Sequence, residues 1–112
     1  MGRDALAAEG LLVANVAGAV HRPEALRSDG AAPGRPLTLH AEPDNPHDPN
    51  AVAVLTSAGL PLGYVPRELA PLVGDDWSAI VLRERRLTPR DPRTGVTMLL
   101  AHADAIELTV AG

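Results

Sequence analysis

The segment EPDNPHDPNAVAVLTSAGLPLGYVPRELA, residues 42–70, decides the fold of this chain. Its first nine residues, 42–50, contain three prolines, and proline cannot donate a hydrogen bond to a strand ladder. The prolines that flank His47 and Asp48 restrict the backbone of that pair, and Asn and Asp side chains bond to nearby backbone amides. We therefore predict a rigid, ordered turn here, of the kind that positions exposed polar groups for binding.

Strand signals follow this turn. The Val-rich run 51–57, a turn at Gly59 and the run 60–65 predict a β-hairpin. Pro66 with an acidic residue close behind it is typical of a helix start. We therefore predict a helix from Pro66 to about Gly74.

Further strands are predicted on both sides of the hairpin. Val-rich or alternating runs, separated by stretches with Pro and Gly, indicate short strands joined by loops. With the hairpin they make about six or seven strands and one or two short helices, which is typical of a mainly β small barrel or sandwich. The order contains no βαβ unit, so a parallel sheet is not expected. The predicted strands lie at residues 11–20, 37–42, 77–86 and 96–110, and the loops at 22–36 and 88–95.

The length of 112 residues fits one domain. We expect residues 1–9, which are rich in Ala and charge, to be a lead-in, and residues 10–112 to form that single domain. The absence of cysteine excludes disulfides, thiolate zinc sites and cysteine nucleophiles. The sequence has neither a membrane-spanning apolar run nor a signal-like N-terminus, so we expect a cytoplasmic location without membrane contact.

Charge restricts the partners that this chain can bind. The net charge is −4, so binding to nucleic acid requires a local basic patch. All ten basic residues are Arg. The planar fork of Arg suits phosphate, although the absence of Lys is also typical of a GC-rich genome. Without Lys no GxxxxGK[ST] phosphate loop exists, and no serine lies in a nucleophile-elbow pattern, so we expect no catalytic residue and no enzymatic activity.

The motif that begins with the proline-rich turn resembles the HIRAN domain family. This small β-rich module occurs at the N-terminus of DNA-repair translocases and as a free-standing bacterial domain. The resemblance implies an OB-like or SH3-like small barrel with a groove that receives single-stranded DNA, in particular a free 3′ end. The matching residues are Glu42, Pro43, Asn45, Pro46, His47, Asp48, Asn50 and Ala51, and then Gly63, Tyr64, Val65 and Pro66.

The resemblance also implies roles for single residues. Asp48 is expected to lie at the 3′-hydroxyl. A carboxylate accepts a hydrogen bond from a hydroxyl group, whereas it repels a phosphate. Asn45 and His47 are expected to face the terminal nucleotide. The alternative for Asn45 and Asp48 is to cap the turn and nothing more. The family carries an Arg and an aromatic residue just after a Gly in its first strand, and here His21 and Arg22 stand nearest to those positions.

Tyr64 and Arg67 complete the predicted interface. Tyr64 is the sole Tyr of the chain and offers a ring on which a base can stack. Its alternative is a place in the barrel core with the hydroxyl bonded. Arg67 lies at the start of the predicted helix, where the helix end and the guanidinium both favour phosphate. Its alternative is a solvated position on the surface.

A second basic feature lies near the C-terminal end of the predicted strand 77–86. Residues 83–93 carry a net charge of about +3 in this acidic chain. We predict a phosphate patch there, with a solvated edge strand that resists aggregation as the alternative. The patch consists of Arg83, Arg85 and Arg86, followed by Arg90 and Arg93.

The expected function is therefore that of a non-catalytic module without cofactor or metal, which binds single-stranded DNA or DNA ends in repair or replication. A separately encoded helicase or nuclease is the expected protein partner. One alternative is a protein-interaction barrel without DNA affinity, which the acidic charge and the scarcity of aromatic residues favour. Another is a metal-dependent hydrolase that uses His47 and Asp48 with His40 and Glu42, although this spacing fits no metal motif.

Overall fold

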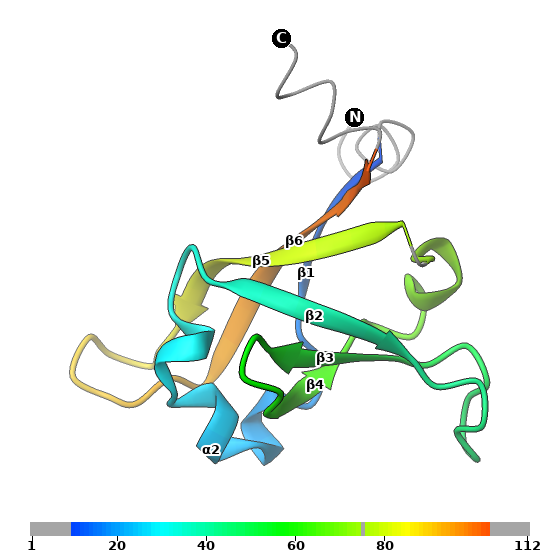
Figure 1. Ribbon diagram of the computed structural model, residues 1–112. Helices are drawn as coiled ribbons and strands as arrows, with labels where there is room; N and C mark the ends of the chain where they lie inside the picture. Colours follow the sequence, from blue (N-terminus) through cyan, green and yellow to red (C-terminus); the bar gives the residue numbers. More distant parts are fainter. Residues whose placement is uncertain (1–9, 75, 104–112) are drawn as a thin grey trace, which may run out of the picture.

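The computed structural model describes residues 10–74 and 76–103 of the chain. In this part of the chain six antiparallel strands form one sheet in the order β1-β6-β5-β2-β3-β4 (Figure 1). The prediction of a mainly β, barrel-like fold is confirmed. The strands are β1 (Leu11–Asn15), β2 (Pro36–Ala41), β3 (Val52–Thr56), β4 (Pro61–Tyr64), β5 (Trp77–Arg85) and β6 (Gly95–His102).

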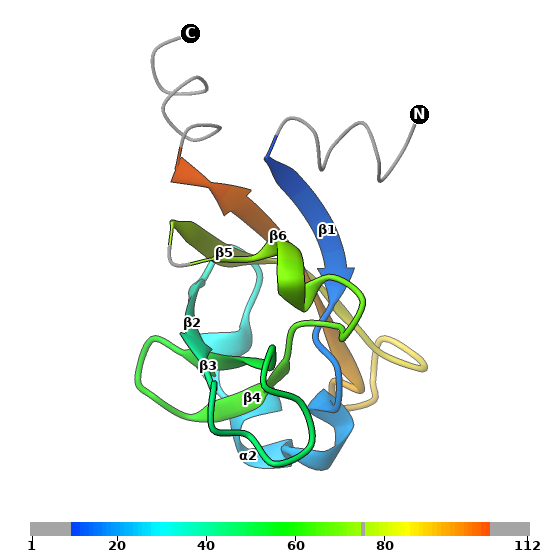
Figure 2. The ribbon, with the colours of Figure 1, turned by 90° about the vertical axis from the view of Figure 1, so that its right-hand side faces the viewer.

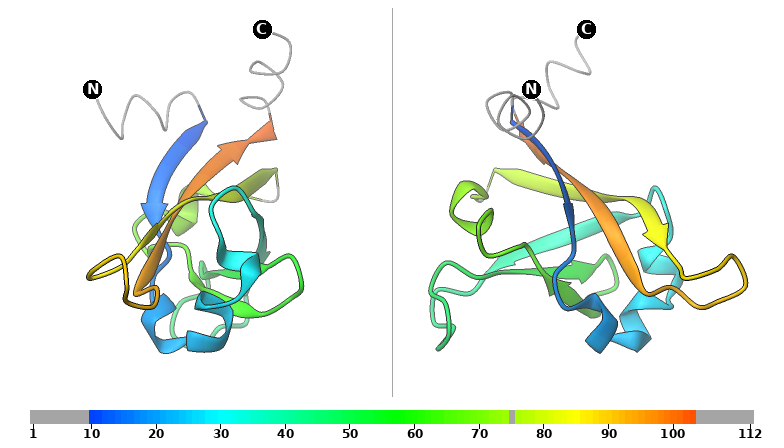
Figure 3. Two further views of the ribbon diagram at one scale, coloured as in Figure 1. Left: turned by 90° about the vertical axis from the view of Figure 1, so that its left-hand side faces the viewer. Right: turned by 180° about the vertical axis from the view of Figure 1, so that it is seen from behind.

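The sheet curls until the chain beyond β1 meets β4. The N–H of Ala17, two residues past the end of β1, donates to the carbonyl of Tyr64 at 2.8 Å, and the N–H of Tyr64 donates to the carbonyl of Ala17 at 3.0 Å. Figures 2 and 3 show the strong twist that makes this closure possible, with β1 and β6 running steeply across β5 and β2. The result is a partly open barrel whose two outer strands are joined at one bridge.

Gly63 is the residue that allows β4 to come this close. A Cβ atom placed on Gly63 would lie 2.3 Å from the carbonyl oxygen of Ala17 and 2.7 Å from the Cγ1 atom of Val16. Neither distance is compatible with a side chain. The glycine of the Gly-Tyr motif is therefore required by the approach of two backbones.

The interior of the curl is filled by aliphatic side chains. The chain has no Phe, so Leu, Val and Met must supply the buried area. β1 and β3 bury alternate residues, as the period of two in a strand requires, whereas β6 is buried along most of its length. The largest fully buried side chains are Leu12, Leu62, Met98, Leu100, Val54, Val81, Val96 and Thr56.

The segment predicted as a loop over residues 22–36 contains short helices, and the predicted strand 11–20 ends early. Gly18 adopts a left-handed conformation with φ of 77°, which turns the chain out of the sheet after β1. Pro23 then sits at the first position of a helix, where its missing N–H costs nothing. These elements are η1 (Ala19–His21), α2 (Pro23–Leu26) and η2 (Asp29–Ala31).

The prediction of a helix from Pro66 to about Gly74 is wrong. The N–H groups of Leu69 and Ala70 both bond to the carbonyl of Pro66, but only one 3-10 turn follows, η3 (Ala70–Leu72). Pro71 lies inside it, and its ring lacks the N–H that an α-helix would need at that point. The predicted lead-in and the continuation of the last strand over 104–110 lie outside the described residues.

No helix within the described residues is both long and apolar enough to cross a membrane.

The closure at Gly63 can be tested by substitution. We expect Gly63→Ala to lower the free energy of unfolding by about 3 kcal/mol, because the new methyl group overlaps the backbone of Ala17. Gly74→Ala is the matched control, since a Cβ atom there meets nothing within 4 Å. Urea unfolding of both variants measures the difference, and equal stabilities would show that the two backbones are not in contact.

Candidate nucleic-acid interface

The turn between β2 and β3 is held by the side chain of Asn45. Its Oδ1 atom accepts hydrogen bonds from the backbone N–H groups of His47, at 2.8 Å, and Asp48, at 3.1 Å. Its Nδ2 atom donates to Oε1 of Glu42 at 3.0 Å. Both ends of the amide are therefore engaged within the turn. This explains why an Asn is needed at this position even if it never touches a ligand.

Asp48 has one oxygen inside the turn and one directed outward. Its Oδ1 atom accepts from the N–H of Asn50 at 2.9 Å, and its carbonyl accepts from the N–H of Ala51 at 3.0 Å, where β3 begins. Its Oδ2 atom lies 3.9 Å from Nε of Arg67. The carboxylate can thus hold the turn and still offer an acceptor to a ligand. The Asp48 side chain is 20% exposed and that of Arg67 is 84% exposed.

Tyr64 is tied to the same turn through its hydroxyl. The hydroxyl donates to Oε1 of Glu42 at 2.9 Å, so one carboxylate oxygen receives both Asn45 and Tyr64. These two hydrogen bonds, that of Asn45 first, lower the pKa of Glu42. The bond to Glu42 raises the pKa of Tyr64. The Tyr64 ring is half-buried, so its position is fixed while part of it remains accessible.

A groove of about 360 Å³ brings five of the predicted site residues together. One wall carries the acceptor of Asp48 and the cation of Arg67, while the Tyr64 ring and small apolar side chains supply the remaining surface. Figure 1 shows the β2–β3 turn projecting at the end of the barrel that holds this groove. The lining residues are Asn45, His47, Asp48, Tyr64 and Arg67, with Ala17, Ala51 and Val65.

His21 and Arg22 do not line this groove. Both lie beside a separate hollow of about 310 Å³ between η1 and β4. Arg22 also borders a depression of about 230 Å³ on the other side of Tyr64, with His40 and Glu42. Tyr64 therefore separates a surface with Arg22 from the groove with Arg67, and His21 is the more remote of the two predicted residues.

Arg67 reaches the groove by a different route from the one predicted. The expected helix N-terminus is missing, so no helix end supports a phosphate beside it. The turn at Pro66 places the residue, and its side chain extends into solvent next to Asp48. What Arg67 offers is an exposed charge at the rim of the groove.

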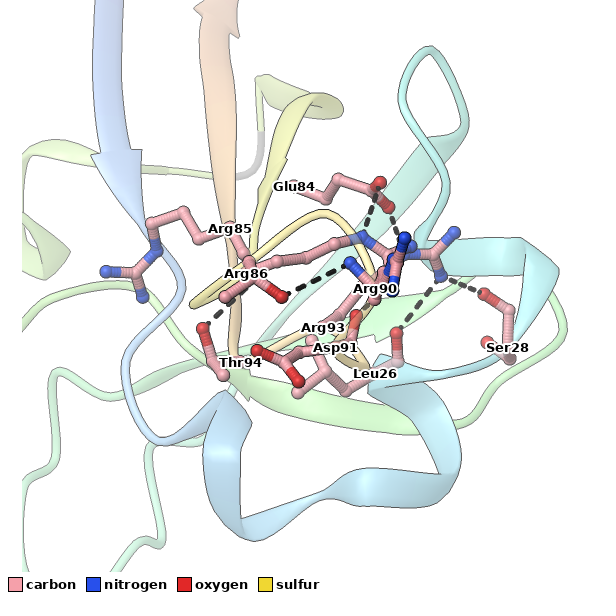
Figure 4. A network of polar contacts seen from close by, with 10 residues as sticks. Leu26, Ser28, Glu84, Arg85, Arg86, Arg90, Asp91, Arg93 and Thr94 are labelled. Carbon is pink, nitrogen blue, oxygen red and sulfur yellow. Dashed lines mark hydrogen bonds and ion pairs between the residues drawn. The ribbon is translucent and has the colours of Figure 1, made fainter.

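The arginines of the second basic feature fall into two groups. Arg86 and Arg93 both bind the carboxylate of Glu84, and Arg93 also donates to the carbonyls of Leu26, at 3.1 Å, and Ser28, at 2.8 Å (Figure 4). These bonds, that of Arg86 first, lower the pKa of Glu84. Arg86 therefore has a structural role. Arg83 and Arg85 are exposed, on the face of β5 whose partners in β6 are Thr97 and Gly95.

Glu42 is the residue whose role sequence reasoning missed. It belongs to the motif, yet its connection to Tyr64 spans 22 positions and depends on the closure of the barrel. The only signal in the sequence for this role was that the family motif has an acidic residue three positions before Asn45. Within residues 10–74 and 76–103, no three His, Asp or Glu side chains converge in a way that could hold a metal ion.

The contact between Glu42 and Tyr64 predicts a defined pH dependence. The lowered pKa means that ionised Glu42 stabilises the fold above its ordinary value of 4.5, and that this contribution is lost as the pH falls through the lowered pKa. We expect Tyr64→Phe to lower the free energy of unfolding by about 1 kcal/mol at pH 7. The loss should become smaller as the pH falls through the lowered pKa of Glu42. Chemical unfolding at several pH values measures this difference.

Glu42→Gln is the control, because the pH dependence of the Tyr64→Phe effect should disappear in that background. A Tyr64→Phe effect that stays constant from neutral to strongly acidic pH would contradict the assignment.

Comparisons with known proteins agree with this architecture. A family model described as the HIRAN domain matches residues 10–101. The crystal structure of the HIRAN domain of human HLTF is similar with a TM-score of 0.54 and 18% identity, over 89% of this chain and 83% of that chain. The NMR structure of the same domain gives a TM-score of 0.51 and 16% identity, over 92% and 84%.

A crystal structure of a protein from Lactobacillus plantarum is also similar, with a TM-score of 0.50 and 24% identity over 80% of this chain and 92% of that chain. The comparison with curated proteins found no match. At these identities the structural likenesses show a shared fold. The family model covers the whole sheet from β1 to Ala101 in β6, and it includes the turn and the Gly-Tyr bridge described above. This chain belongs to the HIRAN domain family.

Proposed function

We propose that this domain is a non-catalytic nucleic-acid-binding module that receives the end of a single DNA strand in the groove beside Asp48. The observation that carries the proposal is the convergence of three complementary groups in one groove. Asp48 offers the carboxylate oxygen that lies beside Arg67, Arg67 an exposed cation and Tyr64 a fixed ring. The groove volume of about 360 Å³ lies in the range of pockets for small ligands.

The outward oxygen of Asp48 supports selectivity for a free 3′-hydroxyl. A terminal hydroxyl can donate to a carboxylate, whereas a terminal phosphate brings a second negative charge to the same place. Arg67, 3.9 Å away, can pair with the phosphate that precedes the last nucleotide. The Tyr64 ring can carry a base, since stacking on an aromatic ring contributes about 1–3 kcal/mol per base.

The charge of the chain favours one second candidate, a protein-interaction domain without DNA affinity. The net charge is −4, and Tyr64 and Trp77 are the only aromatic residues besides histidine. Long-range attraction to nucleic acid is therefore weak, and binding depends on local groups.

In the proposed DNA-binding role, the domain positions a separately encoded helicase or nuclease at DNA ends during repair or replication.

The role of Asp48 can be tested without disturbing the turn. Asp48→Asn keeps an oxygen for the N–H of Asn50 and removes the negative charge. We expect the parent to prefer strands with a 3′-hydroxyl over strands with a 3′-phosphate, and Asp48→Asn to lose most of this preference. Fluorescence anisotropy with labelled oligonucleotides measures it. Asp44→Asn, in the same turn and exposed, is the matched control, and equal behaviour of the two variants would refute the role of Asp48.

The role of Arg67 predicts a different effect. Arg67→Ala should weaken binding to every single strand several-fold and flatten the dependence of log Kd on log salt concentration by about one unit, because one phosphate contact is lost. The end preference should stay. Arg27→Ala, which also removes an exposed charge but outside the groove, should leave both quantities unchanged. An unchanged salt dependence in Arg67→Ala would show that its side chain does not meet a phosphate.

A further inference from the structure

The loop between β5 and β6, residues 86–94, is fixed to the body of the domain at its base. The Arg93 side chain is only 14% exposed. It binds Glu84 on β5 and donates to the carbonyls of Leu26 and Ser28, which lie at the end of α2 and just beyond it (Figure 4). A largely covered guanidinium with this many partners holds the base of the loop in one position.

Further hydrogen bonds order the loop itself. Arg86 donates from Nη1 to the carbonyl of Asp91 and from Nε to Glu84. The N–H of Asp91 donates to the carbonyl of Thr88 at 3.0 Å, and the N–H of Arg90 donates to the Thr88 hydroxyl at 3.3 Å. The loop is therefore preorganised, and a ligand that binds it loses little affinity to the ordering of the backbone.

This loop presents an aliphatic side chain to solvent near its start. Leu87 is 83% exposed, which is the largest exposed fraction among the large hydrophobic side chains within the described residues. The surrounding Thr88, Pro89 and Arg90 are exposed as well. The loop therefore offers a partner an accessible apolar side chain in an ordered backbone.

The charges around Leu87 determine which partner fits. Residues 83–93 carry a net charge of about +3, whereas the whole chain carries −4. Two of the five arginines are bound to Glu84, but Arg83, Arg85 and Arg90 are exposed, and their side chains make no hydrogen bond or ion pair with any residue of 10–74 or 76–103. Figure 4 shows the Arg85 side chain directed away from Glu84. The free charge of this hairpin is complementary to a polyanion.

We propose that the β5–β6 hairpin is a second nucleic-acid contact, separate from the groove, which binds the backbone of a double helix. The exposed arginines contact phosphates of the duplex, and Leu87 lies against the sugars in the minor groove. Apolar side chains of this kind are found at minor-groove contacts, where they pack against or wedge between base steps. Figures 1 and 3 show this hairpin and the β2–β3 turn on opposite sides of the molecule.

A duplex suits this loop better than a single strand does. Residues 83–94 contain no aromatic residue, so no ring is present on which unpaired bases could stack. A double helix keeps its bases stacked and presents phosphates at regular spacing to the exposed arginines of this ordered hairpin. The hairpin should therefore bind without preference for sequence.

The test uses a blunt duplex with 3′-phosphates on both strands, so that no free 3′-hydroxyl is offered to the groove. Binding is followed by fluorescence anisotropy at several salt concentrations. For the double variant Arg85→Ala/Arg90→Ala we expect about tenfold weaker binding at low salt and a salt dependence that is flatter by about two units. The variant Arg27→Ala/Arg35→Ala removes the same number of exposed charges outside both the groove and the hairpin, and it should bind this duplex like the parent.

Leu87→Ala tests the apolar part of the contact. We expect duplex affinity to fall about threefold to fivefold with the salt dependence unchanged, since no charge is removed. Because Leu87 is exposed, thermal unfolding should be the same as in the parent. An affinity equal to that of the parent would overturn the assignment of Leu87.

The results for the hairpin and for the groove can be told apart. Failure of the parent to bind the blocked duplex at low salt, or equal binding by the two double variants, would overturn the hairpin site and favour a protein partner there. The variant Arg85→Ala/Arg90→Ala still has the groove, so its binding to a single strand with a free 3′-hydroxyl reports on the groove alone. Whether this variant binds that strand therefore tests only the function proposed above.

Discussion

The pair of hydrogen bonds between Ala17 and Tyr64 is the interaction on which the rest of this structure depends. It joins the two ends of a six-stranded sheet and fixes the backbone of Tyr64 at the open side of the barrel. Gly63 permits the contact because any side chain there would meet the opposing backbone. Once Tyr64 is fixed, its hydroxyl reaches Glu42, and Glu42 in turn holds Asn45. The groove thus follows directly from closure of the sheet.

This chain of contacts shows which features can be predicted from the sequence. Alternation and turn residues located the strands, and the proline, Asn and Asp pattern identified an ordered turn, because these are local effects. The prediction of a helix after Pro66 was wrong because Pro71 interrupts that segment. The bond between Glu42 and Tyr64 could not be foreseen from spacing, since it depends on which strands meet across the barrel. The same holds for Arg93, which contacts carbonyls 65 and 67 positions away.

The motif residues of the family have different physical roles within one turn. Asn45 has both polar atoms engaged by the turn, so the turn alone accounts for an Asn at this position. Asp48 has one engaged oxygen and one that faces the groove. Although the chain as a whole is acidic, exposed positive charge lies at Arg67 on the rim of the groove and at the β5–β6 hairpin.

In the proposed function, closure of the barrel builds a binding groove for a strand end between residues 45 and 67. The most direct measurement is a titration of the ¹⁵N-labelled domain with a short single strand that carries a free 3′-hydroxyl, followed by amide chemical shifts. We predict that the largest shifts occur at His47, Asp48, Tyr64 and Arg67, with small changes in residues 86–94. Shifts confined to other faces of the barrel, or no shifts at millimolar strand, would contradict it.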